Sequence, residues 1–179
     1  MTPPSYQRTA RLLNQPPKTK KQKPSAKARR SAARLAAVQA LYQIALIGTD
    51  VETVVGEFVQ HRFGAELDGD VFVTPEPTSF AAIVRGASVR REDVDALIAG
   101  SLDSTWTVER LELLLRVVMR AGAWELLANP EVAPRIVISE YVDVAHAFFG
   151  GKEPAMVNGV LDRIARTLRP DEMAAGAVG

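Results

Sequence analysis

Positive charge is the most concentrated chemical feature of this 179-residue chain. Of its 22 lysines and arginines, ten precede Asp50, which is the first of its 21 acidic residues. Positive charge at one end of a chain attracts polyanions, and nucleic acid is the commonest soluble polyanion. A solvated tail that only aids solubility explains the same charge, so charge alone leaves both interpretations open. The ten residues are Arg8, Arg11, Lys18, Lys20, Lys21, Lys23, Lys27, Arg29, Arg30 and Arg34.

No set of residues suited to catalysis or metal binding accompanies this charge. The chain has no cysteine, which excludes disulfides and thiolate metal sites. His61 and His146 fall on different expected helices, without Cys, Asp or Glu at ligand spacing. No nucleophile elbow, phosphate loop or dinucleotide fingerprint occurs. We therefore expect a binding protein that is not an enzyme and that uses no cofactor or metal.

Composition bounds the size of the fold and its compartment. A chain of this length, 47% hydrophobic, fits one domain or two small subdomains that share a core. No apolar run reaches the roughly 18 residues needed to span a membrane. The basic N-terminus is not followed by the apolar core of a secretory signal. The expected compartment is the cytoplasm.

The basic region divides into an arm and a helix. Five prolines and most of the lysines lie in residues 1–24, which we expect to be disordered because proline and like charges both oppose helix formation. A helix rich in alanine, leucine and arginine is expected from Ser25, which can cap it, to Gly48, which can end it. On it, Lys27, Arg30 and Arg34 share one face. Its expected buried side comprises Leu35, Val38, Leu41, Tyr42 and Ala45.

The rest of the chain also shows helical periodicity, so we expect an all-α fold. The segment "RIVIS" could form a strand because of its β-branched residues, but the apolar spacing that follows it favours a helix. The expected elements are a helix over 50–63, a loop over 64–77, a helix from Ser79 that is kinked or broken near Gly86, an apolar helix from about Thr107 to Asn129, a helix ending at Gly150-Gly151, and a last helix over 153–167 that Pro170 closes. The nine residues 171–179 are expected to be a flexible tail.

Two segments carry a resemblance to a known family. The first is "ARRSAARLAAVQALYQ" over residues 28–43, and the second runs from "LRVVMRAGAWELL" through "AMVNGVLDRIA" over residues 115–165. Their order and spacing resemble the NusB family of transcription antitermination factors. The resemblance implies a single all-helical domain over residues 25–170, made of two small bundles side by side. It also implies binding of single-stranded boxA RNA together with the small ribosomal-subunit protein NusE, in an antitermination complex on RNA polymerase during ribosomal RNA transcription.

The resemblance also implies which residues meet RNA. Arginines of the first helix would contact phosphates, a tyrosine ring could stack on an unpaired base, and an amide could reach a base edge. Core packing explains Tyr42 equally, a surface amide explains Gln39, and a structural role explains Asn158. Met156 stands where relatives often carry phenylalanine and would offer apolar contact without a π face. The expected RNA-binding residues are Lys27, Arg29, Arg30, Arg34, Gln39, Tyr42, Lys152, Met156 and Asn158.

The partner surface is expected on the helix that follows Thr107. Leu115 stands where relatives often carry an acidic residue on the helix that meets the ribosomal protein, and Glu109 and Glu112 on the same expected helix could substitute for it. Ser139 and Tyr141 replace the Asn and Ala of the usual "I-N-E-A", whereas Glu140 is kept and is expected to form a structural ion pair.

Two other functions are compatible with parts of this pattern. The same helical domain resembles the RNA-targeting part of certain ribosomal RNA cytosine methyltransferases, which use a separate catalytic domain with a nucleophilic cysteine. This sequence holds no cysteine, so it could only be such a domain detached. A generic helical protein with a basic tail would instead bind random duplex DNA as well as boxA RNA.

Overall fold

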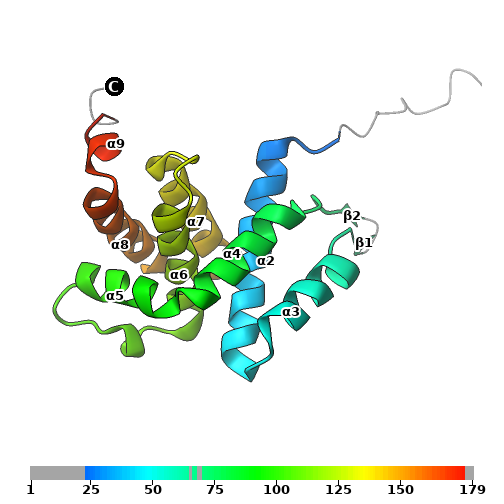
Figure 1. The fold of residues 1–179 in the computed structure, drawn as a ribbon, viewed down its shortest axis with the longest axis horizontal. Coiled ribbons are helices and arrows are strands. Elements are labelled where there is room, and N and C mark those ends of the chain that lie inside the picture. The colour runs from blue at the N-terminus through cyan, green and yellow to red at the C-terminus, as the bar shows by residue number, and fades with distance from the viewer. Residues whose placement is uncertain (1–22, 65, 68–69, 176–179) are drawn as a thin grey trace, which may run out of the picture.

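The computed structural model describes residues 23–64, 66–67 and 70–175. Figure 1 shows helices and one short pair of strands, with the helices arranged as two small bundles side by side, so the predicted all-α fold is confirmed. Most of the expected basic arm, residues 1–22, lies outside the described residues, as does the end of the expected tail, 176–179.

Helix α2 (Ala26–Ile47) begins and ends where the sequence predicts. The Ser25 side chain accepts a hydrogen bond of 3.1 Å from the Ala28 amide, which satisfies one of the free donors at the helix start. Gly48 adopts a φ of 70°, a conformation that glycine takes without strain. The buried face of α2 consists mainly of small residues, which allow close packing. Its buried apolar residues are Ala33, Ala36, Ala37, Val38, Ala40 and Leu41. The prediction that Ala45 is buried is wrong, because it is exposed.

Three helical segments and a hairpin complete the N-terminal bundle. They are α3 (Val51–Glu57), the π-helical turn η1 (Phe58–Arg62), the antiparallel strands β1 (Glu66–Leu67) and β2 (Asp70–Val71), and α4 (Pro77–Val89). The expected loop therefore contains a short hairpin. The break expected near Gly86 is wrong, since α4 runs through Gly86 and the chain turns at Arg90. Phe80 packs against Phe58 and Phe63, with ring centroids 5.4 and 4.9 Å apart, which closes this bundle.

The C-terminal bundle consists of the helices that follow. They are α5 (Arg91–Ser101), the 3-10 turn η2 (Val108–Arg110), α6 (Leu113–Ala128), α7 (Pro134–Phe148), α8 (Glu153–Leu168) and α9 (Pro170–Ala175). The helical alternative for "RIVIS" is confirmed. Pro170 begins α9 instead of closing the chain, and Met173, in the expected loose tail, is 1% exposed. Proline suits the first turn of a helix because no partner exists there for its missing N–H.

Helix α6 joins the two bundles. It contacts α2 and α4 on one side and α5, α7 and α8 on the other, so both of its faces are buried. A helix buried nearly all round must be apolar nearly all round, which its sequence "LLLRVVMRAGAWELLA" satisfies with few exceptions. One of these exceptions, Glu125, is 2% exposed and is central to the site described below. Among the described helices, none combines the length and apolar character needed to cross a bilayer.

The cap at Ser25 determines how firmly the basic start of α2 is held. Replacing Ser25 with alanine removes the acceptor for the Ala28 amide and should destabilise the first turn by about 1 kcal/mol. Hydrogen exchange at Ala28 should therefore accelerate about fivefold, while Ser25→Asp should keep the native rate. Equal exchange in Ser25→Ala and the native protein would show that the cap contributes nothing.

Candidate nucleic-acid interface

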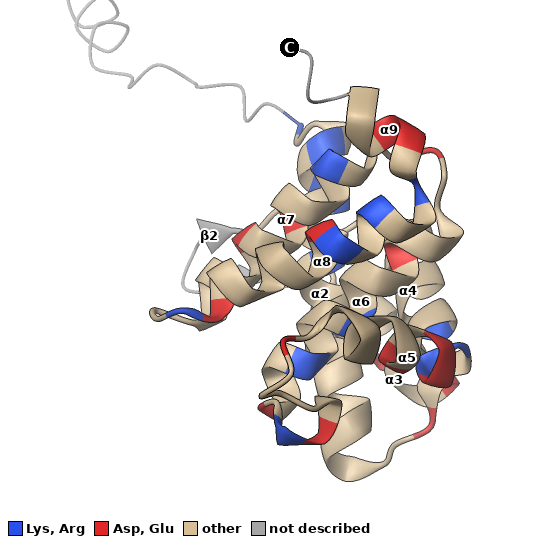
Figure 2. Cartoon of the chain, turned by 90° about the vertical axis from the view of Figure 1, so that its left-hand side faces the viewer, with Lys and Arg blue, Asp and Glu red and all other residues tan. Residues whose placement is uncertain are grey.

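The exposed cations of α2 gather at its first turns. Figure 2 shows blue segments at the N-terminal end of α2. Lys27 and Arg30 are exposed, and no ion pair holds either of them among the residues that the structure describes. Because they lie three residues apart on a capped helix, both side chains point to the same side. Two mobile cations on one rigid element suit contacts with successive phosphates.

Both cations border an open groove of about 940 Å³. Four parts of the chain form its walls: α2, the start of α4, the α6–α7 connection and the start of α7. The lining residues missed by the sequence prediction include Ser79, Asn129, Arg135 and Ser139. They supply hydrogen-bond donors and acceptors beside the cations. No local pattern marks them, because α2 and α7 meet only in the folded chain.

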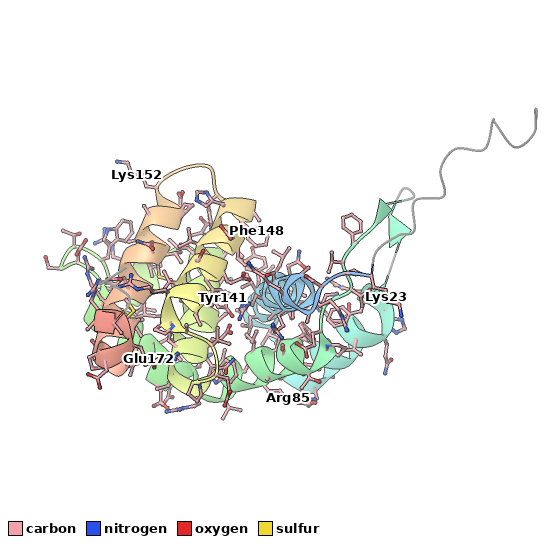
Figure 3. All side chains as sticks on the ribbon, turned by 90° about the horizontal axis from the view of Figure 1, so that it is seen from above. Lys23, Arg85, Tyr141, Phe148, Lys152 and Glu172 are labelled. Carbon is pink, nitrogen blue, oxygen red and sulfur yellow. The ribbon has the colours of Figure 1, made fainter. Side chains whose placement is uncertain are left out.

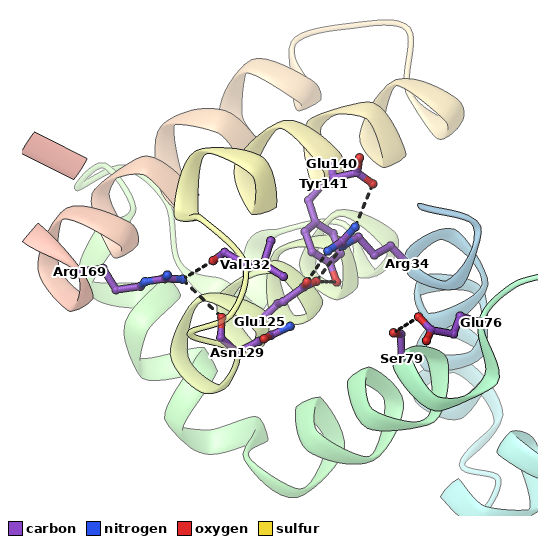
Figure 4. Close-up of polar contacts among 9 residues, drawn as sticks. All are labelled: Arg34, Glu76, Ser79, Glu125, Asn129, Val132, Glu140, Tyr141 and Arg169. Atoms are coloured by element: carbon purple, nitrogen blue, oxygen red, sulfur yellow. Dashed lines mark hydrogen bonds and ion pairs between the residues drawn. The ribbon is translucent and has the colours of Figure 1, made fainter. Parts of the chain in front are cut away.

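Two of the lining residues, Arg34 and Glu140, belong to a buried polar network centred on Arg34 (Figure 4). Arg34 is 6% exposed and donates from Nε to Glu125 at 3.0 Å and from Nη1 to Glu140 at 3.1 Å. The Tyr141 hydroxyl donates to the same Glu125 carboxylate at 2.9 Å. The network thus links α2 to α6 and α7. The ion pair expected for Glu140 is confirmed.

Charge and burial determine the protonation of Arg34 and Tyr141. Burial disfavours the charged form of Arg34, but the hydrogen bonds and the charge of Glu125 outweigh it, so the pKa of Arg34 is raised. Burial, together with the neighbouring Glu125 carboxylate, raises the pKa of Tyr141 well above its usual value. Tyr141 therefore remains a neutral hydrogen-bond donor, and Arg34 remains a cation compensated by two carboxylates.

This geometry changes the role assigned to Arg34. The sequence correctly places it on the same face as Lys27 and Arg30, because all three line the groove. The expectation that Arg34 offers its charge to RNA phosphates conflicts with its burial and its pairing with Glu125 and Glu140. A guanidinium held in this way positions helices instead of attracting an external anion.

Arg29 also has a structural contact. It is half-buried, and its Nε donates to the Thr74 carbonyl at 3.3 Å. Its own carbonyl accepts from the Glu76 amide at 3.1 Å. These bonds tie α2 to the segment before α4. Arg29 is thus placed beside the exposed cations but is less free than they are.

The next two expected RNA-binding residues on α2 differ in exposure. Tyr42 is half-buried and packs against the core, as expected if it is a core residue. Gln39 is exposed and lines a second groove of about 510 Å³ with apolar walls that include Phe63 and Phe72. The structure therefore does not bring Gln39 or Tyr42 into the groove beside Lys27.

The C-terminal candidates lie on another part of the surface. Lys152 and Asn158 are exposed, whereas Met156 is half-buried against the core. Figure 3 shows Lys152 at one side of the molecule and Lys23, just before α2, at the opposite side. An RNA that touched both regions would have to cross the face of α7.

The expected partner-binding acids lie just before α6, not on it. Glu109 belongs to η2 and Glu112 directly precedes Leu113, where α6 begins. The expectation that both lie on that helix is therefore wrong, although both are exposed. Leu115 is 5% exposed and belongs to the core.

Both histidines lie on the surface. His61 and His146 are both exposed, and the part of the chain that the structure describes contains no cluster of three metal-ligating side chains.

Comparisons with known proteins agree with this architecture. Residues 31–166 match the model of the NusB family. A transcription antitermination protein NusB from Rhizobium rhizogenes is 46% identical over 140 residues, which are 78% of this chain and 88% of that protein. The solved NusB of T. maritima is 26% identical with a TM-score of 0.67, covering 82% of this chain and 96% of that one.

A further solved structure shares the fold at lower identity. It contains the antitermination factors NusB and NusE in complex with double-stranded RNA, and its matching chain is 24% identical with a TM-score of 0.65. The match covers 80% of this chain and 99% of that one. The family model extends from within α2 to within α8. This chain belongs to the NusB family.

Proposed function

We propose that this protein is an RNA-binding transcription antitermination factor without enzymatic activity. It binds boxA-type single-stranded RNA together with the ribosomal protein NusE and acts in the antitermination complex on RNA polymerase during ribosomal RNA transcription. A cytoplasmic location is part of the proposal, because nascent RNA is reached there. The observation that carries it is the match of residues 31–166 to the NusB family.

The start of α2 supports RNA contact in this chain. Lys27, Arg29 and Arg30 precede the matched residues, so their role rests on geometry instead of family membership. Lys27 and Arg30 are exposed cations at the rim of a groove whose walls offer Ser79, Asn129 and other polar groups. Phosphates on the cations would hold the strand while unpaired bases reach the groove.

The other proposed contacts are secondary. Gln39, Lys152 and Asn158 are exposed and can meet a strand that runs on from α2. Tyr42 and Met156 are half-buried and would contribute ring or thioether edges. Glu109 and Glu112 remain the proposed contacts for NusE.

The direct test removes the two exposed cations. Each phosphate neutralised on a single strand contributes roughly −0.7 to the slope of log affinity against log salt. Lys27→Ala/Arg30→Ala should therefore reduce the magnitude of that slope by about 1.4 and weaken boxA RNA binding at low salt. Fluorescence anisotropy across a salt series measures both quantities.

A matched control keeps the change in net charge constant. Arg90 and Arg91 are exposed cations at the α4–α5 junction, so Arg90→Ala/Arg91→Ala removes the same charge elsewhere. If both double variants weaken binding equally, the attraction comes from overall charge and the assignment to α2 is wrong. Equal binding of random duplex DNA and boxA RNA by the native protein would favour the generic nucleic-acid-binding alternative.

The proposed function requires that the binding of boxA RNA and the binding of NusE are coupled. RNA binding should be tighter in the presence of NusE, since each ligand of a coupled pair raises the affinity for the other. The alternative of a detached methyltransferase domain predicts no such coupling. The match to 88% of the relative from Rhizobium rhizogenes supports the factor over the detached domain.

A further inference from the structure

A small pocket opens from the groove beside the start of α2. It has a volume of about 170 Å³ and lies where α2 and α4 face the end of α6. Residues that line both this pocket and the larger groove are Arg30, Arg34, Ser79, Asn129 and Val132. We call it the α4–α6 pocket. A strand that follows the groove therefore passes the mouth of a more confined space.

The size and the apolar walls of the α4–α6 pocket suit one six-membered ring. The apolar lining comes from α4, α6 and the α6–α7 connection and consists of Ala82, Ile83, Trp124 and Val132. An engineered protein cavity of roughly 150 Å³ with apolar walls holds one benzene molecule. A pyrimidine ring therefore fills a space of about 170 Å³, whereas the two fused rings of a purine exceed it.

Polar groups at the pocket match the edge of such a base. The Asn129 side chain offers an acceptor oxygen and a donor NH₂ group, and a pyrimidine carries donors and acceptors side by side on its pairing edge. The Ser79 hydroxyl donates to Glu76 at 2.7 Å, so its oxygen can still accept a hydrogen bond. Figure 4 shows Asn129 and Ser79 on opposite sides of the Glu125 carboxylate. The Asn129 amide can pair with uracil or with cytosine, which have the same ring size.

Contacts within the protein hold the walls of the pocket in place. Arg169, which follows α8, donates to the Val132 carbonyl at 2.8 Å and to the Asn129 carbonyl at 3.5 Å (Figure 4). These bonds fix the α6–α7 connection. On the inner side, Arg34 and Glu125 are 6% and 2% exposed and bind each other. A pocket that is already formed loses little conformational freedom when a ligand enters, so more of the contact energy remains as affinity.

The cations beside the pocket indicate that its occupant is part of a nucleotide. Arg30 belongs to the lining of the pocket, and Lys27 lies three residues away on the same face of α2. A phosphate held by Arg30 brings the base of the same nucleotide to the pocket, because the sugar links the two. An apolar side chain of another protein would not use these cations.

We infer that the α4–α6 pocket receives one unpaired pyrimidine base of the RNA, an inference that rests on the proposed function. The base leaves the strand at Arg30, and its ring contacts Ile83 and Val132. Its pairing edge meets the Asn129 amide. Proteins that recognise single-stranded RNA commonly read bases that are splayed out of the strand in this way. The pocket thus gives the groove a preference for pyrimidine over purine, which phosphate contacts alone cannot supply.

The test measures binding of oligouridine and of oligoadenosine of equal length to the full chain by fluorescence anisotropy. Ala82 is exposed at the rim of the pocket, so Ala82→Phe fills the pocket without changing the charge. This variant should bind oligouridine about tenfold more weakly than the native chain, which is within the usual effect of losing one base contact. Its affinity for oligoadenosine should not change. Ala99→Phe is the matched control, because Ala99 is exposed on α5, and it should bind both as the native chain does.

Asn129→Ala tests the polar contact separately. Arg169 binds the carbonyl of Asn129 and not its side chain, so this variant keeps the α6–α7 connection in place. The preference for oligouridine over oligoadenosine should fall about fivefold, the usual effect of one hydrogen bond. The salt dependence should stay native, because the phosphate contacts remain. Gln60→Ala removes another exposed amide, on η1, and should keep the native preference.

The outcomes separate this inference from the proposed function. Equal binding of oligouridine by Ala82→Phe and Ala99→Phe would overturn the inference, because the pocket would then be unused. An equal loss for both oligonucleotides in Ala82→Phe would also overturn it, since the added ring would then obstruct the strand and not a base. A native chain that binds boxA RNA without preferring oligouridine to oligoadenosine overturns the inference alone. A native chain that binds no RNA overturns the proposed function as well.

Discussion

Arg34→Ala should lower the free energy of unfolding by about 3–5 kcal/mol, the usual cost of removing one partner from a buried ion pair. The cost arises mainly from the carboxylate that is left behind. Glu125 is 2% exposed, and among the described residues it would keep only the Tyr141 hydroxyl as a hydrogen-bond partner. A buried charge that has lost its counter-ion cannot be rehydrated without opening the contact between α2 and α6.

Urea unfolding of the native protein and three variants tests this expectation. The control is Arg85→Ala, because Arg85 also makes two hydrogen bonds to one carboxylate, that of Glu52, but on the surface. Its removal should cost little, since water solvates both groups. The double variant Arg34→Leu/Glu125→Leu should be more stable than Arg34→Ala, because the more deeply buried of the two carboxylates is removed together with its partner. Arg34→Ala with the stability of Arg85→Ala would show that the network is dispensable.

The same result bears on how RNA binding is tested. Arg34 and Arg30 lie four residues apart, so the sequence alone suggests replacing both to probe phosphate contacts. The structure predicts that such a variant loses RNA affinity because α2 shifts or unfolds, even if Arg34 never meets RNA. Replacing Lys27 and Arg30 keeps the buried network intact. A loss of binding in that variant can then be assigned to the surface.

Local signals in the sequence predict the helices well where one residue determines a boundary. Ser25 and Gly48 mark both ends of α2, because a side-chain acceptor and a positive φ are local requirements. Proline misleads at Pro170, because it is compatible with both the end of one helix and the first turn of the next. The identity of the family came from motifs in α2, α6 and α8, not from these boundaries.

The candidate site is less predictable, because it depends on contacts between distant residues. Periodicity places Lys27, Arg30 and Arg34 on one face, but it cannot show that Glu125 and Glu140 lie opposite only one of them. The partners of Arg34 are 91 and 106 residues away in the chain. The distinction between an arginine that binds RNA and one that holds the fold is therefore made by tertiary structure alone.

Gly86 is a second residue whose role depends on a contact with a residue far away in the sequence. Glycine inside a helical pattern suggests a weak point, and on that basis the sequence predicts a kink or break. In the structure α4 passes through Gly86 without interruption. A Cβ atom built on Gly86 would overlap the indole ring of Trp124 on α6. Gly86 is thus required by close packing between two helices and not by flexibility.

The two explanations for Gly86 predict opposite signs for the same substitution. If flexibility alone mattered, Gly86→Ala would stabilise the helix by about 0.5–1 kcal/mol. Overlap with Trp124 instead predicts a loss of about 1–3 kcal/mol in the free energy of unfolding. Gly159→Ala is the matched control, because Gly159 lies inside α8 with no atom within 4 Å of the added Cβ, and it should stabilise the protein.

The decisive measurement is a double-mutant cycle in urea between positions 86 and 124. Trp124→Phe removes the fused ring that a methyl group at Gly86 would strike, so it should make Gly86→Ala less costly than in the native background. Independent effects of the two substitutions would mean that α4 and α6 can move apart at this point. Strong coupling would mean that their separation is fixed here, and that the wall of the groove beside Arg34, to which Ser79 of α4 belongs, is fixed with it.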